Sequence, residues 1–284
     1  SGNVAPSAEA GPNYTVPAET ALVLNGSGSD SDDDSLTYLW EQRDLGSARP
    51  LSAADDGSIP LFRVFTPVSS AKRYLPKLEK VVSGELDYSE KVPVKSRTMD
   101  FALTARDSRG GVTSDNMQIE VVAAPLVGEP FSIAEPNEGG ESLGSMGTVR
   151  WNVAETDSAP VSTAQVELYL STDGGVNFSN TPFATTANDG YARVSFPSGI
   201  QTNTARIMLK GKDNIFFDVT DKNFSLNSNA SATPEVPAPT NVALTSGDGR
   251  IDISFSAGST SGVNRHDVAC IGAPSSQSVS GSAS

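Results

Sequence analysis

The stretch GSGSDSDDDSLTYLWEQ, residues 26–42, decides the fold class of this chain. Its second half alternates as a β-strand, with Leu36, Tyr38 and Trp40 on one face and Thr37, Leu39 and Glu41 on the other. Its first half crowds Asp30, Asp32 and Asp34 into one turn, where unit charges a few Å apart repel by roughly 1 kcal/mol even in water. A divalent cation would reverse the sign of that interaction. We therefore expect a calcium-clamped turn that opens a strand of a β-sandwich.

Calcium suits this turn better than zinc. It accepts about six to eight oxygen ligands in loose geometry, whereas zinc prefers His or Cys. A further acidic candidate is Asp107, because the alternating strand at 99–105 ends in the Gly-containing turn 106–111. Both turns could meet at one end of a sandwich. The predicted calcium ligands are Asp30, Asp32, Asp34 and Asp107.

The aspartates also fit two other interpretations, an EF-hand and a solvated turn without metal. An EF-hand is excluded, because Ser35 occupies the position that needs Gly and the following strand carries Glu41 roughly 23 Å from Asp34. A solvated turn without metal stays open, because Asp and Ser form turns through local hydrogen bonds.

Composition indicates an all-β protein of tandem domains. The 284 residues suffice for about two or three domains, and strand-like segments alternate with Gly, Asp, Asn and Pro turns. The net charge of −14 argues against nucleic acid and anionic membrane surfaces as partners. No apolar run approaches the roughly 20 residues of a membrane span, and the single cysteine, Cys270, excludes an internal disulfide framework. The two ends of the sequence lead us to expect a fragment of a longer polypeptide.

Catalysis is not expected within these residues. The single histidine, His266, excludes an HExxH zinc site and other multi-histidine metal centres. The segment 26–28 lacks the frame of a G-x-S-x-G nucleophile elbow. The 34 acidic residues offer many carboxylate pairs for glycoside hydrolysis, but nothing in the sequence selects one.

The expected domains follow from strand patterns and Pro-rich joints. Residues 1–125 form a first sandwich with an opening strand in 1–20, a strand at 60–65 and a long insertion at 66–96 that holds a short helix at 75–86. Residues 126–227 form a second sandwich, in which Trp151 is expected in the core and Asp173 and Asp189 in hairpin turns. A Pro-rich linker then spans 228–239.

Several segments carry a family resemblance: AGPNYTVPAET, LTYLWEQRDLG, PLFRVF, RTMDFALTARD and GGVTSDNMQIEV. They resemble the PKD-like domain that follows the catalytic domain of secreted bacterial reprolysin-like zinc metallopeptidases. Asp30, Asp32 and Asp34 fall on that family's acidic positions, whereas Ser31 replaces its Pro and Asp33 its Gly. The loss of Gly bears on metal binding, because Gly supplies positive φ without steric cost.

The resemblance continues beyond the first domain. Residues 131–226 are similar to the immunoglobulin-like β-sandwich that follows the PKD-like unit in the same peptidases. Residues 239–255 resemble the opening of a fibronectin type III domain, with Phe255 where that family has Trp. A complete domain of this kind needs about 90–100 residues, so 240–284 is expected to be an incomplete segment.

The resemblance implies a secreted or cell-surface, non-catalytic accessory region whose catalytic zinc lies outside the chain. Its expected cofactor is structural Ca²⁺, with no zinc. Its expected partner is an extracellular protein, a polysaccharide or its own catalytic domain. An alternative is a fragment of a bacterial surface adhesin in which tandem sandwiches act as spacers. A carbohydrate-binding module is less favoured, because both Trp residues lie on alternating strands.

Overall fold

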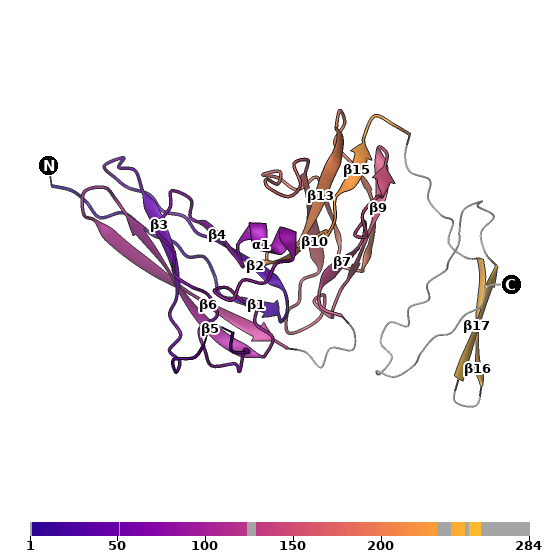
Figure 1. Cartoon of the computed structure of the whole chain (residues 1–284), viewed down its shortest axis with the longest axis horizontal. Helices are drawn as coiled ribbons and strands as arrows, with labels where there is room; N and C mark the ends of the chain where they lie inside the picture. Colours follow the sequence, from indigo (N-terminus) through magenta and orange to yellow (C-terminus); the bar gives the residue numbers. More distant parts are fainter. Residues whose placement is uncertain (1, 51, 124–128, 232–239, 248–249, 257–284) are drawn as a thin grey trace.

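The computed structural model describes residues 2–50, 52–123, 129–231, 240–247 and 250–256. Two immunoglobulin-like β-sandwiches follow one another along the chain, and a separate hairpin comes after them (Figure 1). Within the described residues the only α-helix is α1 (Leu78–Ser83). The predicted all-β class with tandem sandwiches is confirmed.

The first sandwich packs a four-stranded sheet against two strands at the end of a second, longer sheet. The four-stranded sheet has the order β1 (Tyr14–Pro17), β6 (Val112–Val122), β5 (Arg97–Arg106) and β3 (Thr37–Gln42). Opposite it lie β2 (Ala21–Asn25) and β4 (Lys72–Leu75). Trp40 is buried, as predicted for β3, and its indole donates to the Ala71 carbonyl at 2.8 Å. Tyr38 and Leu39, on opposite faces of the strand, are both half-buried, so the predicted alternation is only partial. The largest apolar side chains buried between the sheets are Leu22, Leu24, Leu75, Met99, Phe101, Leu103 and Ile119.

The second sandwich has the same two-layer plan. One sheet contains β12 (Tyr191–Ser195), β9 (Met146–Asn152) and β7 (Ser132–Glu135). The other contains β11 (Ala184–Ala187), β10 (Gln165–Ser171), β13 (Gln201–Gly211) and β14 (Phe216–Val219). The short strands β8 (Ser142–Leu143) and β15 (Phe224–Asn227) extend β13 at one end.

Side chains in the second sandwich behave as the sequence predicts. Trp151 is buried, and its indole donates to the Asn188 side chain at 2.9 Å. Asp173 accepts from the Asn177 backbone amide at 3.0 Å, which with further hydrogen bonds lowers its pKa to about 2. Asp189 accepts from the backbone amide of Tyr191 within its own turn. These two aspartates are turn formers.

The two sandwiches share one sheet. Strand β14 of the second sandwich pairs antiparallel with β2 of the first, with Phe217 opposite Ala21, so a single sheet runs in the order β11, β10, β13, β14, β2, β4. The Val23 amide donates to the Ile215 carbonyl at 2.8 Å, and the Asn214 side chain donates to the Thr15 carbonyl at 3.0 Å. Nothing in the strand periodicity indicated this junction, because pairing partners across domains leave no local pattern.

Two details of the first domain differ from expectation. Residues 60–65 form an isolated bridge at Phe62 rather than a strand, and adjacent Leu61 and Phe62 are both buried. Segment 66–96 is less an insertion than a part of the sandwich, because it supplies edge strand β4 before α1. The helix is also shorter than predicted, since Gly84 ends it with a φ of 66°.

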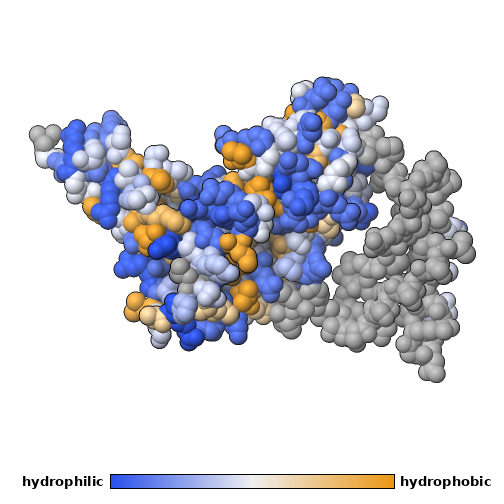
Figure 2. Space-filling model, in the orientation of Figure 1, coloured by the Kyte–Doolittle hydropathy of each residue, from blue (hydrophilic) through white to orange (hydrophobic). Residues whose placement is uncertain are grey.

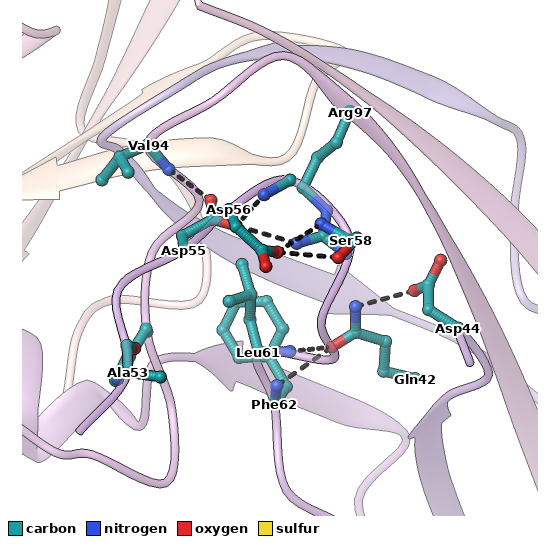
Figure 3. A network of polar contacts seen from close by, with 12 residues as sticks. Gln42, Asp44, Ala53, Asp55, Asp56, Ser58, Leu61, Phe62, Val94 and Arg97 are labelled. Carbon is teal, nitrogen blue, oxygen red and sulfur yellow. Dashed lines mark hydrogen bonds and ion pairs between the residues drawn. The ribbon is translucent and has the colours of Figure 1, made fainter. Parts of the chain in front are cut away.

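A polar network fastens the loop between β3 and the bridge at Phe62 (Figure 3). The Gln42 side-chain oxygen accepts from the amides of Leu61 and Phe62 at 2.7 and 3.0 Å. Asp55 pairs with Arg97 at 3.0 Å, with both side chains 2% exposed, and also accepts from the Val94 amide. Side-chain acceptors therefore replace the strand ladder that residues 60–65 lack.

The last strands are β16 (Thr240–Gly247) and β17 (Arg250–Ser256), which pair as a hairpin within the predicted fibronectin-like opening. His266, Cys270 and the rest of 257–284 lie outside the described residues, as do 232–239 of the predicted linker. The described part of the chain contains no helix that is long and apolar enough to cross a membrane.

Candidate metal centre

The acidic turn and the β5–β6 turn meet at one end of the first sandwich. Strand β3 pairs with β5, with Thr37 opposite Arg106, so the residues before β3 and after β5 lie side by side. One carboxylate oxygen from each of Asp30, Asp34 and Asp107 lies within 4.8 Å of the others. The sequence expected this juxtaposition, and the strand register produces it.

Two carboxylate oxygens in this cluster have no hydrogen-bond partner among the residues that the structure describes. Asp30 uses one oxygen to accept from the Asp32 amide at 2.8 Å, while its Oδ2 is buried and unpaired. Asp34 Oδ2 is likewise buried and unpaired, and the Asp34 side chain is only 9% exposed. A buried carboxylate oxygen without a partner costs free energy. The cluster therefore has unused oxygen acceptors of the kind that a hard cation binds.

Asp107 is fixed by donors on several sides. Its Oδ2 accepts from the Asn3 side-chain amide at 2.8 Å, and its Oδ1 accepts from the backbone amides of Arg109 and Gly111 at 2.7 and 2.8 Å. The Asn3 amide, together with these backbone amides, holds the pKa of Asp107 below its ordinary value. Asp107 is thus kept ionised and oriented at the cluster.

Asp32, the fourth predicted ligand, is not part of the cluster. Its Oδ2 accepts from the Val4 backbone amide at 2.8 Å and so holds the N-terminal segment against the turn. The same segment pairs with residues beyond β2, through Ser7 to Ser29 at 2.7 Å and Glu9 to Ser27 at 2.9 Å. The alternate spacing of Asp30, Asp32 and Asp34 in the sequence could not predict that Asp32 lies outside the cluster. The backbone of the turn points its carboxylate in a different direction from those of Asp30 and Asp34.

Asp33 occupies the position where the resembled family has Gly, and it adopts a φ of 58°. Asp enters this left-handed region more readily than most residues. The turn therefore keeps the positive φ that a Gly would supply.

Arg109 supplies a positive charge at the cluster. Its Nε lies 3.1 Å from Asp34 Oδ1, while its own side chain is 63% exposed. One guanidinium set against three carboxylates leaves the cluster negative, and an ion pair this exposed on one side contributes little stability.

The sequence did not single out Asn3, Arg109 or Gly111. A Cβ at position 111 would lie 2.1 Å from Asp107 Oδ2 and 2.9 Å from the backbone of Ala5, so only Gly fits between them. Asn3 is 104 positions from Asp107, and no local pattern connects them. The sequence signal that could have pointed to Gly111 was the Gly110-Gly111 pair at the end of the β5–β6 turn, which indicates a position that needs glycine.

Comparison with known proteins gives fold likeness alone. No protein-family model matches the sequence. No curated protein matches it either. The Ig1-2 module of Drosophila receptor protein tyrosine phosphatase DLAR is similar in fold, with 10% identity, coverage of 80% of this chain and 100% of that one, and a TM-score of 0.39. The Bacteroides ovatus glucan-utilisation protein SGBP-B, solved with a mixed-linkage heptasaccharide, has 14% identity, coverage of 79% and 48%, and a TM-score of 0.22. The insect immune protein hemolin has 8% identity, coverage of 79% and 47%, and a TM-score of 0.23.

Proposed function

We propose that this chain is a non-catalytic, calcium-stabilised binding region of a secreted or cell-surface protein. The observation that carries the calcium claim is the pair of buried, unpaired oxygens on Asp30 and Asp34 beside the fixed carboxylate of Asp107. The tandem immunoglobulin-like sandwiches support the binding role, because this architecture presents loops and edges on a rigid frame. The partner is an extracellular protein, a polysaccharide or a catalytic domain of the same polypeptide.

Asp30, Asp34 and Asp107 would hold the ion, with Asp32 acting beside them as a clamp on the N-terminal segment. Bound calcium supplies positive charge that neutralises the cluster. Arg109 would then be released from Asp34 or would share it with the ion. The carboxylates join three separate segments, so calcium would fasten the turn before β3, the β5–β6 turn and, through Asn3, the chain start.

The family resemblance narrows the proposal to the accessory region of a reprolysin-like zinc metallopeptidase, with the catalytic domain outside these residues. Sequence upstream of this chain tests that assignment. An HExxH motif followed by a third histidine ligand supports it. An upstream array of further sandwiches without that motif would instead support a surface adhesin. The continuous sheet between the two sandwiches favours this alternative, because it makes the pair a stiff spacer.

A melting experiment tests the calcium claim. A ligand that binds only the folded state stabilises it by RT ln(1 + [L]/Kd), about 2.7 kcal/mol at a hundredfold excess over Kd. Calcium should therefore raise the melting temperature by about 5–10 °C relative to chelator. Asp34→Asn should abolish this shift, whereas Asp189→Asn, in a turn of the second sandwich, should retain it. Equal midpoints for the parent protein in calcium and in chelator would remove the metal from the proposal.

A further inference from the structure

A groove of about 820 Å³ lies where the two sandwiches meet, beside β4 and α1. The space-filling view is hollowed between the two sandwiches on the side where Figure 1 draws α1 (Figure 2). Ligand sites typically enclose about 300–1,000 Å³ and are mostly apolar with a few polar groups. The apolar side chains that line the groove include Phe65, Val68, Tyr74, Leu78, Val82 and Val176.

Both sandwiches contribute to this groove. Val68 lies beside β3 of the first sandwich and is 53% exposed, and Val176 lies in a loop of the second and is 72% exposed. A Cβ at position 175 would lie 2.8 Å from the Val82 side chain of α1, so the glycine lets this loop approach the helix closely. The loop of the second sandwich therefore packs directly against α1, which joins the two walls of the groove.

Two lysines at the groove have no close ion-pair partner among the described residues, although Lys77 also acts electrostatically on Asp87. Lys72 and Lys77 form no ion pair with the carboxylates of the described ranges, and their amines lie 6.0 and 4.1 Å from the ring centres of Tyr74 and Phe65. Arg73 differs, because buried Glu90 binds it at 2.7 Å. In a chain of net charge −14, this local surplus favours an acidic ligand, although exposed Glu79 also lines the groove.

Strand β4 offers a free backbone edge at the same place. It ends the long sheet and pairs only with β2 among the described strands. The Gly26 amide donates to the Ala71 carbonyl at 3.2 Å, and the register continues from there with Arg73 opposite Leu24. Because hydrogen-bonded pairs alternate in an antiparallel ladder, the backbone groups of Lys72 and Tyr74 point away from β2. The Lys72 amide donates to the Ser70 hydroxyl at 3.2 Å, so a peptide would displace that hydroxyl and would also pair with the backbone of Tyr74.

We propose that this groove binds an extended, acidic peptide segment of an extracellular partner, which adds to β4 as a further strand. The inference rests on the proposed binding function and assigns it a surface and a ligand class. Acidic side chains would pair with Lys72 and Lys77. The apolar side chains that alternate with those beside Lys72 and Tyr74 point to the opposite face of the added strand, where they would pack toward Phe65 and Val68. A second copy of this chain fits poorly, because antiparallel pairing of two β4 edges would bring lysines together.

A direct binding assay tests the proposal. The probe is a short fluorescent peptide of alternating glutamate and valine, titrated into the whole chain and followed by anisotropy. We expect saturable binding, weakened about tenfold or more in a Lys72→Glu, Lys77→Glu double variant. The matched control is Lys212→Glu, which changes a half-buried lysine of the second sandwich outside the groove and should leave binding unchanged.

Two further probes separate strand addition from charge attraction. The same peptide with N-methyl groups on alternate residues keeps its charge but cannot form the full ladder, so it should bind at least about tenfold more weakly. An oligogalacturonate carries acidic groups without a peptide backbone and should bind weakly. Equal affinity of the N-methylated peptide, tighter binding of the oligosaccharide, or affinity unaffected by the double variant would each overturn the proposal. Each titration is repeated in chelator, so failure of the groove remains distinct from failure of the calcium site.

Discussion

At the scale of residues, the calcium candidate depends on side-chain directions that spacing alone does not define. The sequence correctly placed Asp30, Asp34 and Asp107 at one end of the first sandwich. It could not predict that Asp32 turns to the Val4 amide, because backbone dihedrals within the turn decide where each carboxylate points. Metal ligation itself stays a prediction.

The Asp218 carboxylate of the second sandwich makes stability depend on pH. Burial raises the pKa of Asp218 to about 7, although the Ile133 amide donates to it at 2.7 Å. In the unfolded chain this carboxyl ionises near its ordinary value of 3.8, whereas in the folded state it keeps its proton to about pH 7. Asp218 therefore lowers stability as pH rises between these values, by roughly 1.4 kcal/mol per pH unit, and its contribution is level above about pH 7.

The Asp218→Asn variant isolates this effect, because the amide stays neutral while its oxygen can still accept the Ile133 hydrogen bond. Urea unfolding at a series of pH values should give a difference between parent and variant that grows in favour of Asn from about pH 4 to about pH 7. A difference that is constant over this range would contradict the assignment.

At the scale of elements, the strands with strong alternation were predictable and the irregular segments were not. Trp40 and Trp151 are buried, as their strand patterns predict. Residues 60–65 were also predicted to form a strand, yet the Gln42 side chain takes the amides that a neighbouring strand would otherwise bind. Whether an alternating segment becomes a strand depends on a free neighbouring edge, which local sequence does not reveal.

The loop after β3 depends on the buried pair of Asp55 and Arg97. Removing one partner leaves the other charge buried, so Asp55→Ala should lower the free energy of unfolding by about 3–5 kcal/mol. A double variant, Asp55→Leu with Arg97→Met, should recover much of the loss because no charge remains buried.

Chemical denaturation measures both variants, with Arg49→Ala as the control. Arg49 pairs with Asp56 in the same loop, but its side chain is 50% exposed, so its loss should cost at most about 1 kcal/mol. A loss for Asp55→Ala no larger than that of the control would show that the pair does not secure the loop.

At the scale of the whole molecule, the shared sheet determines how the sandwiches act. An apolar cluster continues across the junction, where Phe217 is fully buried and meets Tyr74 at 5.4 Å between ring centres. Strand pairing plus this cluster should make the two sandwiches one cooperative unit. The sequence separated the domains by composition, which carries no information about pairing between them.

Calorimetry tests the coupling. The parent protein should unfold in a single transition for both sandwiches, with equal calorimetric and van't Hoff enthalpies. Phe217→Ala should cost about 3–5 kcal/mol and split the transition, because it removes packing that belongs to both sandwiches. The control, Phe101→Ala, deletes a ring from the first core away from the junction and should destabilise without splitting. Two separate transitions in the parent protein would contradict a coupled junction.

Isothermal titration of calcium into the chelator-treated chain shows whether the acidic cluster binds the ion. We expect saturable binding with heat release or uptake that disappears in Asp34→Asn and Asp30→Asn and persists in Asp189→Asn. Binding should also survive in Asp32→Asn, because that carboxylate contacts Val4 rather than the cluster. Absence of binding at millimolar calcium, or binding unchanged by loss of both Asp30 and Asp34, would contradict calcium binding by the cluster.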